Sequence, residues 1–224
     1  MGVQKIMSVC YIFSGGIMGD NDLSAFKIPD ADYIISADAG YLYAKKYGFE
    51  TDCLIGDFDT LENLPDDDKY NELLKFKSEK DDTDTMLAVR HALEKDFDKI
   101  YIFGALGGRF DHTFSNVQTL NFIASHGKKG FIVSENEFIT VLNPGEYTFE
   151  KLSGYSFSVF ALSDKAEGVC ERGFKYSLDN ATIENSFPVG VCNEFIEEKG
   201  VISFKSGKIL IVISKKQNLF YENE

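Results

Sequence analysis

The first half of the chain alternates short apolar runs with helix-like segments. Four apolar runs predict buried strands, at residues 6–13, 33–37, 53–55 and 99–103. Four further segments predict helices, at residues 41–47, 67–76, 83–97 and 113–124. In the third of these, Met86, Val89, Leu93 and Phe97 share one face. Strands and helices that alternate in this way favour a mainly parallel sheet covered by helices.

The second half contains closely spaced strand patterns instead. They lie at residues 131–134, 138–142, 147–152, 157–161, 181–184, 201–205 and 209–214. Turn signals such as Asn143-Pro144-Gly145 and Ser206-Gly207 separate them. Short strands between turns are typical of an antiparallel sandwich or barrel.

These patterns predict two domains, an α/β domain with a mainly parallel sheet and then an all-β antiparallel sandwich. The change in pattern falls between about residues 127 and 145. We therefore expect a nucleotide-binding α/β domain at 1–135 and a β-sandwich domain at 136–224.

The net charge of the chain limits the classes of partner that it can bind. It has 36 acidic and 23 basic residues among 224, a formal net charge of −13. So acidic a protein is a poor ligand for phosphate backbones or anionic membranes, so we expect neither nucleic acid nor membrane as a partner. It can still bind a nucleotide if a divalent cation neutralises the phosphates. Most of the acidic side chains are interpreted as solvated surface.

Cysteine and histidine spacing excludes several other classes. The four cysteines form no CxxC pair and suggest no disulfide framework. The histidines, His91, His112 and His126, form no HxxxH or HExxH pattern, which argues against a zinc site. No signal-peptide pattern or membrane-length apolar run is present, so we expect a cytoplasmic protein.

Charged residues follow several of the predicted strands. Asp38 follows one, Asp57 and Asp59 follow the next, and Arg109 with Asp111 follow a fourth. In open parallel sheets, ligands bind beyond the carboxyl ends of the strands. Separate loops are therefore expected to deliver these groups to one crevice.

The segment Gly56-Asp57-Phe58-Asp59-Thr60 places two carboxylates two residues apart. In extended backbone both would project to the same side. Two hard oxygen donors suit Mg²⁺, which prefers a few carboxylates together with water and phosphate oxygens. The alternative is an aspartate-rich turn that caps the next segment.

The segment Lys80-Asp81-Asp82-Thr83-Asp84 precedes the helix predicted at 83–97. Asp82 or Thr83 is a candidate N-cap, and acids there favour the helix dipole. A functional interpretation adds Lys80 for phosphate and Asp84 as a third carboxylate for the metal. The two interpretations are compatible on different residues.

The loop from Gly104 to His112 joins a strand to a helix and contains three glycines. Glycines allow backbone amides to approach an anion, and the N-terminus of the next helix favours phosphate. Arg109 can clamp phosphate oxygens, and His112 can donate to phosphate or cap the helix. The loop is neither a Walker A loop nor a GxGxxG fingerprint, and the glycines are alternatively those of a tight turn.

Together these groups suit phosphoryl or pyrophosphoryl transfer, where positioning and charge neutralisation dominate catalysis. A metal-dependent glycosyltransferase is a rival, since it also uses an aspartate pair. A non-catalytic nucleotide sensor is another. A phosphatase of the haloacid dehalogenase type is disfavoured because Leu61 stands where threonine or valine is expected.

The set of motifs resembles the thiamine pyrophosphokinase family over nearly the whole chain and in the same order. The matching segments are Ala37-Asp38-Ala39-Gly40, Gly56-Asp57-Phe58-Asp59-Thr60, Lys80-Asp81-Asp82-Thr83-Asp84, Gly107-Gly108-Arg109-Phe110-Asp111-His112, Gly173-Phe174-Lys175-Tyr176-Ser177-Leu178 and Val191-Cys192-Asn193-Glu194-Phe195.

The resemblance implies transfer of pyrophosphate from ATP to the hydroxyl of thiamine, with release of AMP. It implies a homodimer whose active sites lie between subunits, with thiamine contacted by the C-terminal domain. By motif, the Mg²⁺ ligands are expected to be Asp57, Asp59 and Asp84. The residues expected on the ATP side are Asp38, Lys80, Arg109, Asp111 and His112.

The thiamine side departs from the family pattern. Cys192 replaces a serine found in many relatives, and a thiol is a weaker hydrogen-bond donor than a hydroxyl. The chain has no tryptophan, so stacking on the thiamine rings falls to Phe174 or Tyr176, unless these are core residues. The residues expected to contact thiamine are Tyr176, Cys192 and Asn193.

Overall fold

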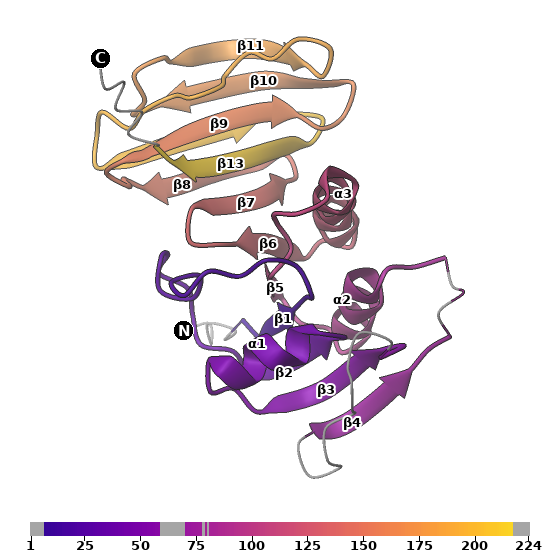
Figure 1. Ribbon diagram of the computed structural model, residues 1–224. Coiled ribbons are helices and arrows are strands. Elements are labelled where there is room, and N and C mark those ends of the chain that lie inside the picture. The colour runs from indigo at the N-terminus through magenta and orange to yellow at the C-terminus, as the bar shows by residue number, and fades with distance from the viewer. Residues whose placement is uncertain (1–6, 59–69, 78, 80, 217–224) are drawn as a thin grey trace, which may run out of the picture. The chain divides into compact units, whose positions relative to one another are not determined.

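The computed structural model describes residues 7–58, 70–77, 79 and 81–216. The chain divides into two compact units, Met1–Glu135 and Asn136–Glu224. Both are coloured by residue number in Figure 1.

The first unit is an α/β unit built on parallel strands in the order β4-β3-β2-β1-β5-β6. Its strands are β1 (Val9–Phe13), β2 (Tyr33–Ala37), β3 (Thr51–Gly56), β4 (Tyr70–Lys75), β5 (Lys99–Phe103) and β6 (Lys129–Val133). The chain adds β2, β3 and β4 outward from β1, then returns to place β5 on the other side of β1. The strand order therefore reverses between β1 and β5, the kind of position where such sheets bind ligands.

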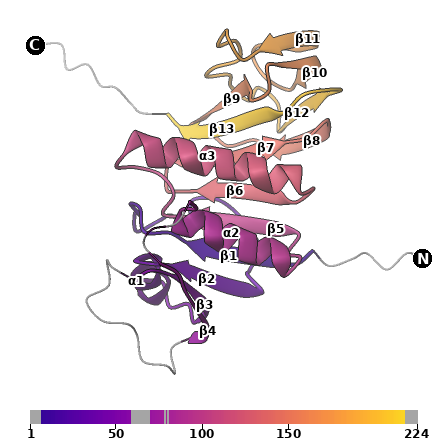
Figure 2. The same ribbon diagram turned by 90° about the vertical axis from the view of Figure 1, so that its right-hand side faces the viewer.

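Helices cover both faces of this sheet (Figures 1 and 2). They are α1 (Gly40–Lys46), α2 (Asp84–Glu94) and α3 (Phe110–Ser125). Tyr41 of α1 clusters with Leu54 of β3, and α2 contacts β1, β2 and β3. Figure 2 shows α2 and α3 side by side, on the face away from α1. Because side chains alternate along a strand, the neighbours of Leu54 face α2.

The second unit is antiparallel, with two groups of strands in the orders β7-β13-β9 and β11-β10-β12-β8. Its strands are β7 (Glu137–Leu142), β8 (Gly145–Glu150), β9 (Tyr155–Ala161), β10 (Lys165–Arg172), β11 (Leu178–Glu184), β12 (Lys199–Phe204) and β13 (Ile209–Lys215). Phe157, Phe174 and Phe195 form the centre of its core, with ring centroids 4.5 to 5.5 Å apart. Burial of these rings supplies the apolar area that holds the two groups of strands together.

The predicted fold class is confirmed, with three local corrections. The helix predicted at 67–76 is wrong, since Tyr70–Lys75 forms the edge strand β4, paired with β3. Good helix formers occur there, but backbone pairing with β3 and alternate burial override that local propensity. The strand predicted at 131–134 pairs parallel with β5, so it belongs to the α/β unit, and β10 was not predicted.

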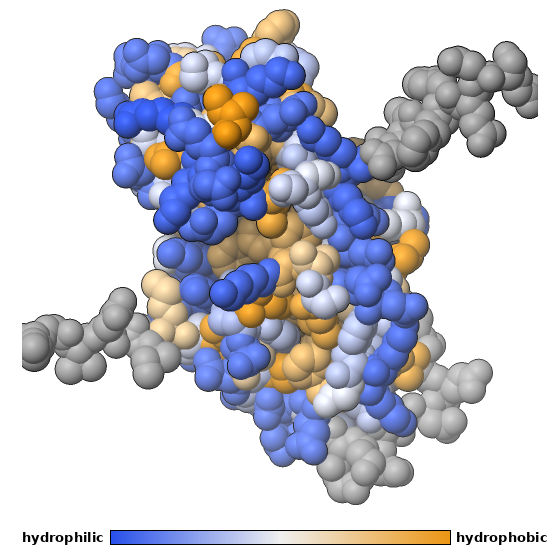
Figure 3. Space-filling model, turned by 90° about the vertical axis from the view of Figure 1, so that its left-hand side faces the viewer, coloured by the Kyte–Doolittle hydropathy of each residue, from blue (hydrophilic) through white to orange (hydrophobic). Residues whose placement is uncertain are grey.

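One face of the molecule is drawn by hydropathy in Figure 3. On the face drawn in Figure 3, hydrophilic side chains predominate and hydrophobic ones lie in groups between them. Within the described part of the chain, no helix combines the length and apolarity that a membrane span requires.

Candidate active site

A cavity of about 700 Å³ lies in the α/β unit, where the strand order reverses. Its walls come from the loops after β1, β2 and β5 and from the N-terminal turns of α2 and α3. The predicted site residues that line it are Asp38, Asp84, Arg109, Asp111 and His112. Residues from three separate motifs are thus brought into one crevice, and two of these motifs follow strands.

Two glycines allow the loops after β1 and β5 to meet. The Gly16 amide donates to the Gly104 carbonyl at 2.9 Å. A Cβ at Gly16 would lie 2.2 Å from the Gly104 oxygen, and one at Gly104 would lie 2.4 Å from the Ser14 oxygen. Gly104 also has a φ of +64°, which side chains with a Cβ rarely adopt. The backbone on this side of the cavity is therefore fixed by two residues that must lack a side chain.

The start of α2 is fixed from two directions. Thr83 is its N-cap, and the Thr83 Oγ1 accepts from the Met86 amide at 3.2 Å. The buried hydroxyls of Ser14 and Thr85 lie 3.0 Å apart, which ties the first turn to the loop after β1. Asp82 pairs with Arg90, with 2.8 Å between Oδ2 and Nε. Capping therefore falls to Thr83 and ion pairing to Asp82, while Asp84 lines the cavity.

Asp38 lies where β2 ends, in a left-handed conformation with a φ of +48°. Its amide donates to the Ile55 carbonyl of β3 at 2.7 Å. A Cβ placed on Gly56 would lie 3.2 Å from the Asp38 Cβ, so the ends of β2 and β3 are close together. Asp38 thereby enters the cavity from a strand end braced by its neighbour.

Asp57 follows directly at the end of β3, but it is not among the residues that line the cavity. Next to it, Phe58 has a φ of +63° and is buried against Tyr41 and Leu54. The backbone is therefore not extended at Phe58. The prediction that Asp57 and Asp59 project to the same side assumed extended backbone here, and that assumption is wrong. Asp59 itself lies outside the described residues, as does Lys80.

Arg109 and Asp111 form a pair at the start of α3. Arg109 Nη2 lies 2.5 Å from Asp111 Oδ2, and Nε lies 3.1 Å from Oδ1. The hydrogen bond from Arg109 holds the pKa of Asp111 below its usual range. Both side chains are exposed, so the pair adds little stability and a phosphate can compete for the guanidinium.

Asn116 is a site residue that the sequence patterns did not reveal. Its Nδ2 donates to the Ala105 carbonyl at 2.7 Å, and the residue is buried. The glycine loop after β5 is thereby attached to the second turn of α3. An asparagine within a helix gives no signal of such a role, because the contact depends on how the loop folds back.

In the second unit, Asn193 is buried and all its amide groups are used internally. Its Oδ1 accepts from the Tyr176 amide at 3.0 Å and from the Glu194 amide at 2.9 Å. Its Nδ2 donates to the Tyr176 carbonyl at 2.7 Å and to Glu171 Oε2 at 3.0 Å. Asn193 therefore joins the two motif segments of this unit to each other.

The other residues expected to contact thiamine differ from Asn193 in exposure. Tyr176 is 63% exposed, with Lys175 Nζ 5.6 Å from its ring centroid. Phe174 is a core residue, which leaves Tyr176 as the available ring of the two. Cys192 is exposed, has a φ of +58° and donates its amide to Ser158 Oγ at 3.0 Å.

Comparison with known proteins identifies the family. The profile described as "Thiamin pyrophosphokinase, catalytic domain" matches residues 27–132. The profile described as "Thiamin pyrophosphokinase, vitamin B1 binding domain" matches residues 146–209. Together the two profiles match most of the chain. The chain belongs to the thiamine pyrophosphokinase family.

Individual relatives agree with this assignment. Thiamine pyrophosphokinase of Bacillus subtilis is 35% identical over 140 residues, which are 62% of this chain and 65% of that protein. The match thus spans slightly less than two thirds of the relative.

Solved structures show the same fold. A crystal structure of thiamine pyrophosphokinase from Bacillus subtilis has a TM-score of 0.82 at 27% identity and covers 94% of this chain and 100% of its own. That of the Geobacillus thermodenitrificans protein has a TM-score of 0.79 at 29% identity, covering 94% and 99%. Both the resemblance noted in the sequence and the predicted fold class are confirmed.

Proposed function

We propose that this protein transfers the pyrophosphoryl group of ATP to the hydroxyl of thiamine, giving thiamine diphosphate and AMP. The observation that carries the proposal is the cavity where the strand order reverses, at which the carboxylates of Asp38 and Asp84, the glycine loop and Arg109 meet. It lies in the unit that the catalytic-domain profile matches. The unit matched by the vitamin B1 profile is then the thiamine-binding domain, 136–224, and 1–135 is the nucleotide-binding domain.

On the ATP side, the loop from Gly104 to Arg109 and the N-terminus of α3 supply backbone amides and a favourable dipole for phosphate. Arg109 neutralises phosphate charge, and Asp111 orients its guanidinium through two hydrogen bonds. His112 and Asp38 line the same cavity and complete the nucleotide side. Lys80, outside the described residues, is proposed to join them by motif.

A divalent cation, Mg²⁺, is proposed to be held by Asp57, Asp59 and Asp84. The donors fit a hard cation, because the described lining includes the carboxylates of Asp38 and Asp84 and the hydroxyls of Thr83 and Thr85, but no cysteine. When bound there, the cation supplies charge neutralisation for the phosphate oxygens.

On the acceptor side, the exposed Tyr176 ring is proposed to stack on thiamine, with Cys192 beside it. Asn193 acts through the backbone hydrogen bonds that hold Tyr176 in place. The active site is proposed to lie between the subunits of a homodimer, and the protein to work in the cytoplasm.

In the reaction, the hydroxyl oxygen of thiamine forms a bond to the β-phosphorus of ATP. The bond between that phosphorus and the α,β-bridging oxygen breaks, and AMP leaves with the electron pair. The hydroxyl proton passes to a nearby aspartate or to water. The residues of the cavity contribute by holding the phosphates in line for this displacement and by placing positive charge beside them.

The test is to incubate the protein with ATP, Mg²⁺ and thiamine and to look for AMP and thiamine diphosphate by mass spectrometry. Both products are expected in equal amounts. ATP that is consumed only with another alcohol overturns the acceptor but leaves the chemistry. Bound ATP that never yields AMP favours a nucleotide sensor. Transfer from a UDP-sugar with Mn²⁺ favours a glycosyltransferase.

A further inference from the structure

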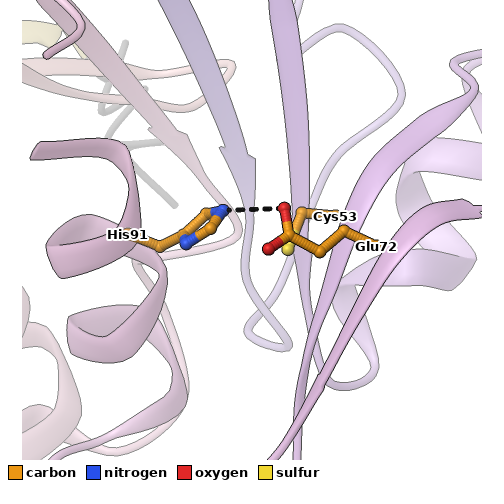
Figure 4. A group of neighbouring side chains, drawn as sticks. All are labelled: Cys53, Glu72 and His91. Carbon is orange, nitrogen blue, oxygen red and sulfur yellow. Dashed lines mark ion pairs between the residues drawn. The ribbon is translucent and has the colours of Figure 1, made fainter. Parts of the chain in front are cut away.

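A group of three potential metal ligands lies in the α/β unit outside the cavity. Cys53 comes from β3, Glu72 from β4 and His91 from α2. One ligand atom of each lies within 4.8 Å of the others, and His91 Nε2 is 3.3 Å from Glu72 Oε2. Figure 4 shows the His91 ring reaching from its helix toward the Glu72 carboxylate, with the Cys53 thiol beside it.

The fold places these groups together although they are far apart in sequence. Cys53 and Glu72 are direct partners in the parallel pairing of β3 with β4. Cys53 lies on the face opposite Leu54, which packs against α1, so its side chain points toward α2. His91 follows Asp84 by seven residues, about 10 Å along the helix, so the group is separate from the cavity.

The ring nitrogen of His91 lacks a well-aligned hydrogen-bond partner among the described residues. His91 Nε2 is buried, and no hydrogen bond of good geometry from any described residue satisfies it, despite the 3.3 Å separation from Glu72. Burial lowers the pKa of His91, which favours the neutral imidazole that metals bind. The Cys53 side chain is fully buried. Buried polar atoms without partners are costly, so a ligand at this point would relieve that cost.

We propose that Cys53, Glu72 and His91 form a structural binding site for a thiophilic divalent cation, Zn²⁺. The donors are one sulfur, one nitrogen and one oxygen, a set that zinc accepts and Mg²⁺ does not. Ligand atoms around a tetrahedral zinc ion are about 3.5 Å apart, so only small movements of the side chains are needed. A water molecule would complete the coordination.

Two neighbouring side chains compete with the cation for the carboxylate of Glu72. Lys95 Nζ lies 3.3 Å from Glu72 Oε2, and the Tyr33 hydroxyl donates to the same oxygen at 3.3 Å. Burial also raises the pKa of the Cys53 thiol to about 12. Binding must therefore release the thiol proton to solvent and displace the Lys95 ammonium from Glu72. Lys95 thus sets how tightly the site binds.

A cation here would connect the edge strand β4 to β3 and to α2. Glu72 and His91 lie on either side of the segment that leads to Thr83 and Asp84. Through His91, the site would therefore hold the last turn of α2 against the sheet. This role is independent of the proposed function, since it concerns stability and a different set of ligands.

The experiment uses chelator-treated full-length protein in excess Mg²⁺, which occupies carboxylate sites, titrated with Co²⁺ as a spectroscopic substitute for Zn²⁺. We expect one Co²⁺ per chain, a thiolate-to-cobalt absorption band, and a melting temperature that rises with Zn²⁺ concentration. Cys53→Ser should remove the band, and His91→Gln should weaken binding by about tenfold or more. Cys170→Ser, at a half-buried cysteine in the other unit, is the matched control and should retain the band.

Lys95→Met provides a test that loss of folding cannot imitate. It removes the competing ammonium while keeping most of the apolar stem, so Co²⁺ should bind more tightly than to the wild type. Absence of the thiolate band in the wild type overturns the proposal. A band that persists in Cys53→Ser, or an affinity unchanged in both His91→Gln and Lys95→Met, also overturns it.

Discussion

The two units use their motif residues in different ways. In the α/β unit, Asp38, Asp84 and Arg109 point into or border a cavity, and their backbone is braced by loops and helix ends. In the antiparallel unit, the motif residue Asn193 is buried, and its side chain forms hydrogen bonds to other residues of the same unit. Motifs that are equally clear in the sequence thus provide residues that line a cavity in one unit and a residue that forms internal hydrogen bonds in the other.

This difference has a physical origin. The loops at the strand ends of a parallel sheet converge whatever their side chains. In the α/β unit, the backbone bond from Gly16 to Gly104 and the buried Asn116 side chain hold them in place. The irregular segments of the antiparallel unit must satisfy their backbone groups by other means, and the Asn193 amide does so.

The largest effect is expected for Asp84→Asn. Loss of a carboxylate proposed to hold Mg²⁺ should lower AMP formation by at least about 10²-fold, with the melting temperature nearly unchanged. Asp82→Asn is the matched control, because it removes an exposed partner of Arg90 and should leave most activity. Equal activity of the two variants in a coupled AMP assay would refute the role of Asp84.

Gly104→Ala tests the bracing of the cavity. The new Cβ would meet the Ser14 carbonyl at 2.4 Å in a left-handed conformation, so we expect a loss of about 3 kcal/mol or more in unfolding free energy. Gly108→Ala has a similar φ of +69° but open space around it, and should cost only about 1 kcal/mol. Urea denaturation measures both, and similar losses would show that the close approach is unimportant.

Asn193→Ala should destabilise the protein by about 2–3 kcal/mol, because several buried backbone groups and Glu171 lose their partner. Tyr176→Ala, at a 63% exposed ring, should change stability by less than about 0.5 kcal/mol and instead raise the KM for thiamine. Denaturation and steady-state kinetics distinguish the two. If Asn193→Ala leaves stability intact, the contrast drawn between the units fails.

Glu171 gives the smallest and most pH-dependent effect. Burial raises the pKa of Glu171 from the ordinary value of 4.5 to about 7. The hydrogen bond from Asn193 lowers the pKa and offsets only part of this rise. Between those values the folded state binds more protons, so stability falls as pH rises from about 4.5 to about 7. Glu171→Gln should flatten this slope and stabilise the protein at pH 8 by about 1–3 kcal/mol. Parallel pH slopes for the two proteins in denaturant titrations would exclude a raised pKa.

Much of the fold was predictable, because burial leaves periodic signals. The strands at 33–37 and 99–103 have the predicted bounds, and Thr83 is one of the two residues proposed to cap α2. The segment at 70–75 was misassigned because an edge strand is only half buried, so strong helix formers obscure its pattern. Pairing with β3 stabilises the strand conformation of this segment. The sequence of one strand does not reveal which other strand it pairs with.

The site was predictable in part for the same reason. Asp38, Asp84 and Arg109 follow or precede regular elements, so topology alone brings them together. Asn116 and the group of Cys53, Glu72 and His91 follow no spacing rule, and the absence of paired-histidine motifs argued against zinc. Their contacts depend on a loop folding back and on a strand register.

The sequence by itself determined the order of elements apart from β4 and β10, the motif residues at strand ends and the family, because each leaves a local pattern. Only the tertiary structure shows that β5 lies beside β1 and that the chain turns at Phe58, next to Asp57. It alone shows that the side-chain amide of Asn193 forms hydrogen bonds within its own unit. It also decided that a cysteine, a glutamate and a histidine from three elements meet. Such contacts arise from packing between segments that are distant in the sequence. Hydrophobic periodicity indicates which face of an element is buried, but not which other element packs against that face.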